Sequence, residues 1–225
     1  MLLLLLLGAA GPVGAVERLL YLDTTGDQET VYSWVVEHGP ETASITVHKS
    51  DLTFVNHCRE NGETVAWSRS GVGSGVNATL QDGVLRVFGE FNGQTVNTTK
   101  DLEGLPWLQP LSYSLPRIVT DLEQDILFWT IRPDTMEPVK LKAEIKGSQE
   151  LVVNGEKVVA YRIRVSPPGF LSMFWHGDYW YRRGDCRFLR YEGLSGAPGS
   201  DKTMVTLLDE PSGLHNESPS CTPAS

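Results

Sequence analysis

Basic residues are scarce in this chain, and they form no continuous block. The 225 residues include 19 Lys and Arg against 28 Asp and Glu, which gives a net charge of −9 at pH 7. Proteins that bind nucleic acids neutralise phosphates with clustered Lys and Arg. The composition therefore indicates that the chain has no nucleic-acid partner.

Long apolar runs are also missing. The longest run, LLLLLLGAA at residues 2–10, is far short of the ~20 residues that a membrane-spanning helix needs. It suits the apolar centre of a signal peptide, and Val13-Gly14-Ala15 resembles a cleavage site. We therefore expect a signal peptide over residues 1–15, no transmembrane segment after cleavage, and a periplasmic or secreted protein of the cell envelope.

The leader departs from the usual pattern in one respect, because no Lys or Arg precedes the leucines. Either the start codon lies upstream, or the amino terminus alone supplies the positive charge. The alternative is a buried N-terminal helix, which several glycines and one proline would interrupt: Gly8, Gly11, Pro12 and Gly14.

Cysteine is rare, with Cys58, Cys186 and Cys221 as the three examples. No Cys-x-x-Cys pair or Cys/His cluster has the spacing of a zinc site, so we expect no metal centre. In an oxidising compartment three cysteines form at most one internal bridge. We expect Cys58 to pair with Cys186, because both lie beside predicted turns, whereas ordering a tail around Cys221 would cost ~1–2 kcal/mol per residue. A Cys186–Cys221 bridge and three free thiols are the alternatives.

The common catalytic motifs are absent from the sequence. The chain has no Gly-x-Ser-x-Gly nucleophile elbow and no phosphate-binding loop before a helix. Gly71, Gly73 and Gly75 lie in a stretch that is typical of a hairpin loop. The sequence therefore favours a non-enzymatic protein, and we expect no cofactor.

The most abundant signal is an alternation of apolar and polar residues with period two. TASITVHK (42–49) and EPVKLKAEIKG (137–147) each place apolar side chains on one face. Asp82-Gly83, Asn92-Gly93 and Asn154-Gly155 are hairpin turn signals. Such short strands predict an all-β, mainly antiparallel fold, either a highly curved sheet or an open β-barrel-like structure.

The middle of the chain interrupts this alternation. Three prolines and three leucines at near-helical spacing predict one short helix over residues 107–115: Pro106, Pro110, Pro116, Leu108, Leu111 and Leu115. No Pro/Ser linker divides the rest, so we expect a single β-rich domain over residues 16–210. Residues 211–225 are rich in Pro, Ser and Thr, which is typical of a disordered tail.

Residues 105–208 carry four segments that resemble a family of exported bacterial proteins, the domain of unknown function 3108. These segments are QDILFWTIRPD, GSQELVVNGEKVVAYRIRV, YWYRRGDCRFLRYEG and GAPGSDKTMVTLLD. The resemblance implies a curved antiparallel sheet or open barrel in the cell envelope. It brings no established catalytic residues, and the family pattern has no cysteine at the position of Cys186.

One aromatic stretch, FWHGDYWYRR at residues 174–183, concentrates the candidate functional side chains. In a strand, His176 and Asp178 share one face and can form a hydrogen-bonded pair, a base with its orienting carboxylate. No nucleophile accompanies them. A hydrolase or transferase that uses His176 and Asp178 is therefore the second hypothesis.

The favoured hypothesis is a binding module. The chain holds six Trp, seven Tyr and seven Phe, and a curved sheet lined by aromatic side chains suits an apolar or amphipathic, lipid-like ligand or an envelope protein as partner. Arginines on the later hairpins can meet an anionic group. The candidate ligand-binding residues are Trp175, Tyr179, Trp180, Tyr181, Arg162 and Arg182.

Overall fold

The computed structural model describes residues 16–118, 125–195 and 199–209. In these ranges fourteen strands form one sheet. The strands are β1 (Val16–Thr25), β2 (Gln28–His38), β3 (Thr42–Lys49), β4 (Leu52–Arg59), β5 (Thr64–Gly71), β6 (Ser74–Gln81), β7 (Val84–Phe91), β8 (Gln94–Asp101), β9 (Ile126–Ile131), β10 (Pro138–Val153), β11 (Glu156–Ser166), β12 (Gly177–Arg182), β13 (Phe188–Leu194) and β14 (Lys202–Asp209). The expected signal peptide and tail lie outside the described residues.

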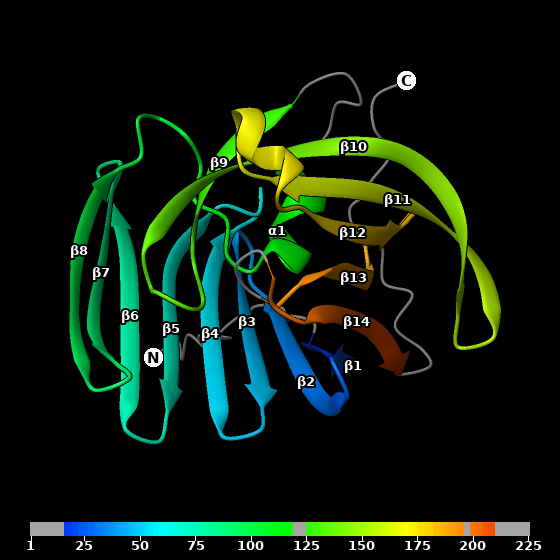
Figure 1. Cartoon of the computed structure of the whole chain (residues 1–225), viewed down its shortest axis with the longest axis horizontal. Helices are drawn as coiled ribbons and strands as arrows, with labels where there is room; N and C mark the ends of the chain where they lie inside the picture. The colour runs from blue at the N-terminus through cyan, green and yellow to red at the C-terminus, as the bar shows by residue number, and fades with distance from the viewer. Residues whose placement is uncertain (1–15, 119–124, 196–198, 210–225) are drawn as a thin grey trace, which may run out of the picture.

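The chain builds this sheet from two meanders that meet at β1. Strands β1 to β8 pair in sequence order, strands β9 to β14 do the same, and β14 then pairs antiparallel with β1. The edges of the sheet are β8 and β9, so the sheet is not closed. Figure 1 shows the strands curving around a central space that holds the helix α1. The predicted all-β, open barrel-like fold is confirmed.

The hairpin turns follow from local sequence. Asp82-Gly83 connects β6 to β7, and Asn154-Gly155 connects β10 to β11. All four residues have positive φ, between 50° and 83°, as a two-residue type I′ turn requires. Asn, Asp and Gly tolerate that conformation best, and its twist matches that of the flanking strands. These turns fix the register of the predicted strands.

The link between β8 and β9, here called the crossing segment (residues 102–118), runs across the inside of the sheet. Its backbone pairs with the edge strand β9, because Trp129 N donates to Pro106 O and Leu108 N donates to Trp129 O, both at 2.9 Å. The helix α1 (Leu111–Ile118) follows, and Leu108 and Leu115 are fully buried in the core. The crossing segment is therefore an inner layer that the sheet wraps around.

The predicted helix exists, but its bounds differ from the expected 107–115. It begins at Leu111, because the preceding backbone is already bonded to strands and the first helical hydrogen bond runs from Ser114 N to Pro110 O at 3.0 Å. Gln109 N, for example, donates to Thr64 Oγ1 at 2.7 Å. The helix then continues through Pro116.

The expected Cys58–Cys186 bridge is wrong. Cys58 is a free thiol, buried on the inner face of β4, and burial raises its pKa to about 11. Cys186 is disulfide-bonded and lies in the β12–β13 turn. Because Cys58 is free, it is not the partner of the bonded Cys186. The alternative partner, Cys221, lies outside the described residues.

Candidate functional site

The candidate catalytic pair does not form. His176 precedes β12 and is exposed, whereas Asp178 lies inside β12 and is buried. Both carboxylate oxygens of Asp178 accept hydrogen bonds from Arg164 on the neighbouring strand β11, at 2.9 and 2.8 Å. A bidentate arginine saturates this carboxylate, so Asp178 supports the sheet and does not orient His176.

Two of the candidate aromatic residues face the inside of the sheet and belong to the core. The ring of Tyr181 lies 5.8 Å from that of Phe188, and its hydroxyl donates to Leu111 O of α1 at 3.0 Å. The ring of Tyr179 lies 4.8 Å from that of Tyr191. Burial raises the pKa of both Tyr179 and Tyr181 well above the usual value. The half-buried Trp175 packs against the same core.

The remaining candidates lie on β12, as Tyr179 and Tyr181 do, and on its neighbour β11. Trp180 is directly opposite Arg162 on β11 and Arg190 on β13. Trp180 is 5% exposed, and the Arg190 guanidinium lies 5.8 Å from its ring centre. Arg182 forms an ion pair with Asp185 at 3.0 Å. The six candidates therefore do not converge on one site.

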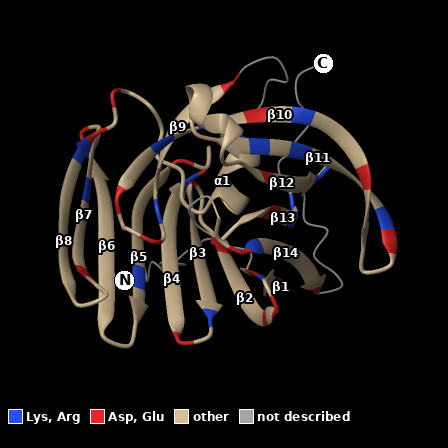
Figure 2. Cartoon of the chain, viewed as in Figure 1, with Lys and Arg blue, Asp and Glu red and all other residues tan. Residues whose placement is uncertain are grey.

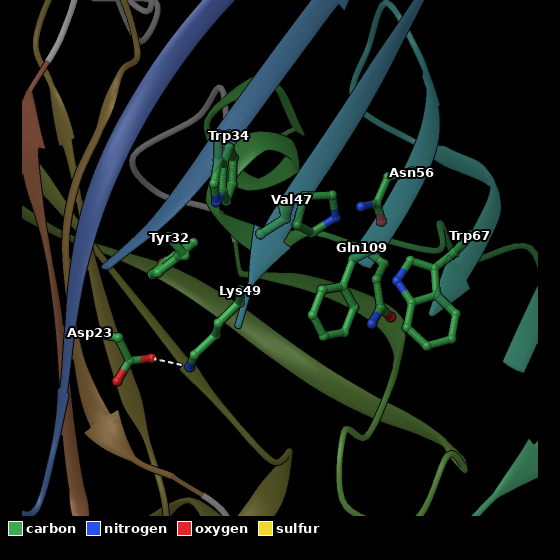
Figure 3. Close-up of a pocket in the computed structure, with 10 residues that line it drawn as sticks. Asp23, Tyr32, Trp34, Val47, Lys49, Asn56, Trp67 and Gln109 are labelled. Atoms are coloured by element: carbon green, nitrogen blue, oxygen red, sulfur yellow. Dashed lines mark hydrogen bonds and ion pairs between the residues drawn. The ribbon is translucent and has the colours of Figure 1, made fainter. Parts of the chain in front are cut away.

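A cavity of about 220 Å³ lies elsewhere, on the inner face of the first meander. It opens to solvent and is bounded by strands β1 to β5 on one side and by the crossing segment on the other. Figure 3 shows the side chains around it. The lining residues are Asp23, Tyr32, Trp34, Val47, Lys49, Phe54, Asn56, Trp67, Gln109 and Pro110.

The wall of the cavity follows from strand pairing. Alternate residues of a strand point inward, and the pairing places inward residues of neighbouring strands side by side. Trp34 is opposite Val47, Val47 is opposite Phe54, and Asn56 is opposite Trp67. An aromatic and aliphatic surface thus extends across four strands.

The crossing segment is held against this wall through Gln109. The Gln109 side-chain oxygen accepts hydrogen bonds from Thr130 Oγ1 at 3.1 Å and Ile131 N at 2.9 Å on β9. Its backbone oxygen accepts one from Thr64 Oγ1 on β5 at 2.7 Å. These bonds fix Gln109 and the adjoining Pro110, so this side of the cavity is preformed.

Polar groups concentrate at one part of the cavity. Lys49 Nζ lies 2.6 Å from a carboxylate oxygen of Asp23, and 5.7 Å from the ring centre of Tyr32. The Lys49 side chain is 36% exposed, so its ammonium group reaches solvent. Burial, with the nearby Tyr21 and Asp23, raises the pKa of Tyr32 well above its usual value, so Tyr32 is a neutral, mostly apolar surface.

Two further lining groups are polar atoms without a partner. Asn56 Oδ1 and Trp34 Nε1 are buried and make no hydrogen bond in the part of the chain that the structure describes. A buried polar atom without a partner costs stability, so these two atoms destabilise the strands that form the cavity wall. The Asn56 amide nitrogen has one contact, to Ile45 O at 3.5 Å.

The lining of the cavity offers apolar contacts, two side-chain amides and one ion pair. It contains one carboxylate and one ammonium group, already paired with each other, and it includes no Ser, Thr or Cys side chain. Across the described ranges, no group of three His, Cys, Asp or Glu side chains could hold a metal ion. Within the same ranges, no helix has the length and apolar character to cross a membrane.

Sequence reasoning missed this cavity, although part of its signal was present. The alternation in residues 31–36 places Tyr32 and Trp34 on one face of a strand, and residues 42–49 do the same for Val47. No single segment, however, contains the site, because each strand contributes one or two residues. The inner position of Gln109 depends on the path of the crossing segment, for which the sequence has no local signal.

A similar barrel-like fold is found in a known structure. A β-barrel-like protein of the domain of unknown function DUF1849 from Brucella abortus is 11% identical with a TM-score of 0.57, and the match covers 89% of this chain and 99% of that chain. This likeness shows the fold alone.

Two weaker likenesses support no further argument. The hypothetical lipoprotein YmcC from Escherichia coli K12 is 11% identical with a TM-score of 0.40, over 85% of this chain and 87% of that chain. A putative outer membrane lipoprotein-sorting protein domain from Vibrio parahaemolyticus is 10% identical with a TM-score of 0.30, over 90% and 88%. Comparisons with protein families and with curated proteins find no match to the sequence, so the resemblance to the domain of unknown function 3108 stays a prediction.

Proposed function

We propose that this chain is an exported, non-enzymatic binding protein of the cell envelope that holds an apolar or amphipathic ligand in the cavity of the first meander. The observation that carries the proposal is an open cavity of about 220 Å³ whose wall includes Tyr32, Trp34 and Trp67. Small-molecule sites combine such apolar walls with a few placed polar groups. Export is supported by the leader of residues 1–15 and by the resemblance of residues 105–208 to an exported family.

The size of the cavity limits the ligand. Its volume lies below the roughly 300 Å³ at the lower end of typical small-molecule pockets. The cavity therefore suits one short acyl chain, or the end of a longer chain whose polar group stays near the Asp23–Lys49 ion pair. The ligand class is thus an amphipathic molecule with a single extended apolar tail.

A cavity-filling substitution tests the proposal. Val47→Phe places a larger side chain in the cavity, whereas Val31→Phe makes the same change at an outward position of β2 that is 55% exposed. Decanol and decanoate serve as probes, and fluorescence reports binding because Trp34 and Trp67 line the cavity. Displacing two ligand carbons at ~0.8 kcal/mol each predicts at least about tenfold weaker binding by Val47→Phe. Val31→Phe should bind like the unmodified protein.

Circular dichroism and thermal unfolding accompany the titration, because overpacking a core position costs about 1–3 kcal/mol. Equal binding by both variants, provided that both are folded, would place the probe outside this cavity. A protein that binds neither decanol nor decanoate at millimolar concentration would contradict the proposed ligand class.

A further inference from the structure

A short 3-10 helix between β11 and β12, η1 (Gly169–Met173), presents apolar side chains to solvent. Phe170 is 72% exposed, Leu171 49%, Met173 79%, and the adjoining Phe174 58%. We call these four residues the apolar tip. In Figure 1, η1 is the short yellow coil at the top of the view, drawn in front of β9 and β10. No residue of η1 is buried, so the apolar tip contributes little to the core.

The apolar tip is a fixed structure. The rings of Phe170 and Phe174 meet edge to face with centres 6.3 Å apart. Ser172 Oγ donates to Gly169 O at 2.8 Å, and Phe174 N donates to Leu171 O at 3.0 Å. Its exposed surface is therefore preorganised, and docking would require little further ordering of the backbone.

Charged side chains are absent from this stretch. Residues 165–175, VSPPGFLSMFW, contain none, and Figure 2 accordingly shows η1 in tan without blue or red. The nearest charged residues that the chain supplies on either side, Arg164 and Asp178, are bonded to each other. Insertion of these residues themselves would thus desolvate no charged side chain.

From this placement we propose that the apolar tip inserts shallowly into the interface of a lipid bilayer and docks the protein on a membrane surface. The exposed area argues for a membrane rather than a protein partner. Four side chains at these exposures offer roughly 500 Å², below the ~800 Å² per partner of a standard protein interface. Apolar side chains such as Phe and Leu bury in the boundary between headgroups and acyl chains, and such shallow insertion needs only the tip.

The charge of the protein specifies the type of surface. With a net charge of −9, the chain as a whole is repelled by anionic lipids, so docking depends on the apolar tip and not on electrostatic attraction. Binding to zwitterionic membranes that persists at high salt is the expected signature. The docking does not depend on the ligand cavity, and either proposal can fail alone.

Flotation of the full chain with phosphatidylcholine vesicles tests the proposal. Met173→Ser/Phe174→Ser removes two side chains of the tip, and Val72→Ser/Val152→Ser is the matched control. The control residues are apolar and 89% and 65% exposed, but lie in other loops and strands. We expect the unmodified protein and the control to float with the vesicles at low and high salt. The tip variant should partition roughly tenfold more weakly for each side chain removed.

Four results would overturn the proposal. In the flotation assay, these are no flotation of the unmodified protein, equal flotation of the tip variant, and flotation that requires phosphatidylglycerol and disappears at high salt. In sedimentation velocity, the fourth result is a dimer of the unmodified protein where the tip variant is a monomer. The last result would assign the apolar tip to a protein interface. Circular dichroism establishes that both variants are folded before the comparison is made.

Discussion

Two regions of the inner sheet face are rich in aromatic residues, and they differ in what lies in front of them. At β12 and β13, Tyr181 packs against Phe188 and is hydrogen-bonded to α1. At β2 to β5, Trp34 and Trp67 border an open cavity. The helix covers the first region, whereas Gln109 and Pro110 cover the second region only in part. Aromatic side chains on a sheet thus mark a candidate binding site only where the inner layer leaves them uncovered.

Trp34 is the boundary between the two regions. Its ring centre lies 6.3 Å from that of Phe188 in the packed region, yet Trp34 also lines the cavity. The core and the cavity are therefore parts of one continuous aromatic surface. Substitutions on either side of Trp34 should separate a stability role from a ligand-binding role.

The largest expected effect comes from truncating the packed region. Tyr181→Ala removes a side chain that is 1% exposed and should lower the free energy of unfolding by about 3–5 kcal/mol. Phe54→Ala removes a half-buried lining side chain and should cost about 1–2 kcal/mol. Urea unfolding followed by circular dichroism measures both.

Tyr181→Phe is the conservative control for this experiment. It keeps the ring but leaves Leu111 O without its donor, and we expect a cost of about 1 kcal/mol. A cost for Phe54→Ala as large as that for Tyr181→Ala would show that both regions are equally packed, which would contradict the distinction drawn between them.

Local sequence patterns predicted the strands and turns but not the site. Residues such as Ile45 and Val47 alternate with polar neighbours, and Asn154-Gly155 prefers the positive φ of its turn, so the chain itself determines these elements. The bounds of the helix depend on bonds from Gln109 to β5 and β9, which are remote in sequence. The cavity depends on the same remote contacts, so a segment-by-segment analysis could not find it.

The FWHGDYWYRR stretch is the converse case, because the local sequence suggested a site whose residues contact other partners in the structure. Composition suggested a site there. In the structure, however, Asp178 is hydrogen-bonded to Arg164, and Tyr181 is buried beneath α1. Which partner a polar side chain meets across strands depends on register, and that register is set by turns outside the stretch.

The Asp178–Arg164 pair gives the second prediction. Asp178→Ala removes both hydrogen bonds of a partly exposed ion pair and should cost about 1–2 kcal/mol of stability. His176→Ala, at an exposed position, should stay within about 0.5 kcal/mol. In double-mutant cycles by urea unfolding, Asp178 should couple to Arg164→Ala and not to His176→Ala. Coupling to His176 would restore the catalytic-pair hypothesis.

The smallest expected effect concerns the seam where the two meanders meet. Glu17 on β1 contacts His38 Nε2 of β2 at 3.4 Å and Arg187 of the β12–β13 turn at 3.1 Å. The hydrogen bond from His38, and the charge of Arg187, lower the pKa of Glu17 below its ordinary value of 4.5 against the opposing effect of burial. A carboxylate with a lowered pKa stabilises the fold above its ordinary pKa, and this contribution is lost as the pH falls from 4.5 through the lowered value.

Comparison of unfolding free energies at pH 7 and near pH 3 tests this contribution at the seam. The unmodified protein should lose about 0.5–1 kcal/mol more than Glu17→Gln over this interval, because the variant has no carboxylate to protonate at the seam. Glu29→Gln, at an exposed position of β2, is the matched control and should follow the unmodified protein. If Glu17→Gln instead lost as much stability as the control, the two meanders would be joined by backbone pairing between β1 and β14 without a measurable contribution from this ion pair.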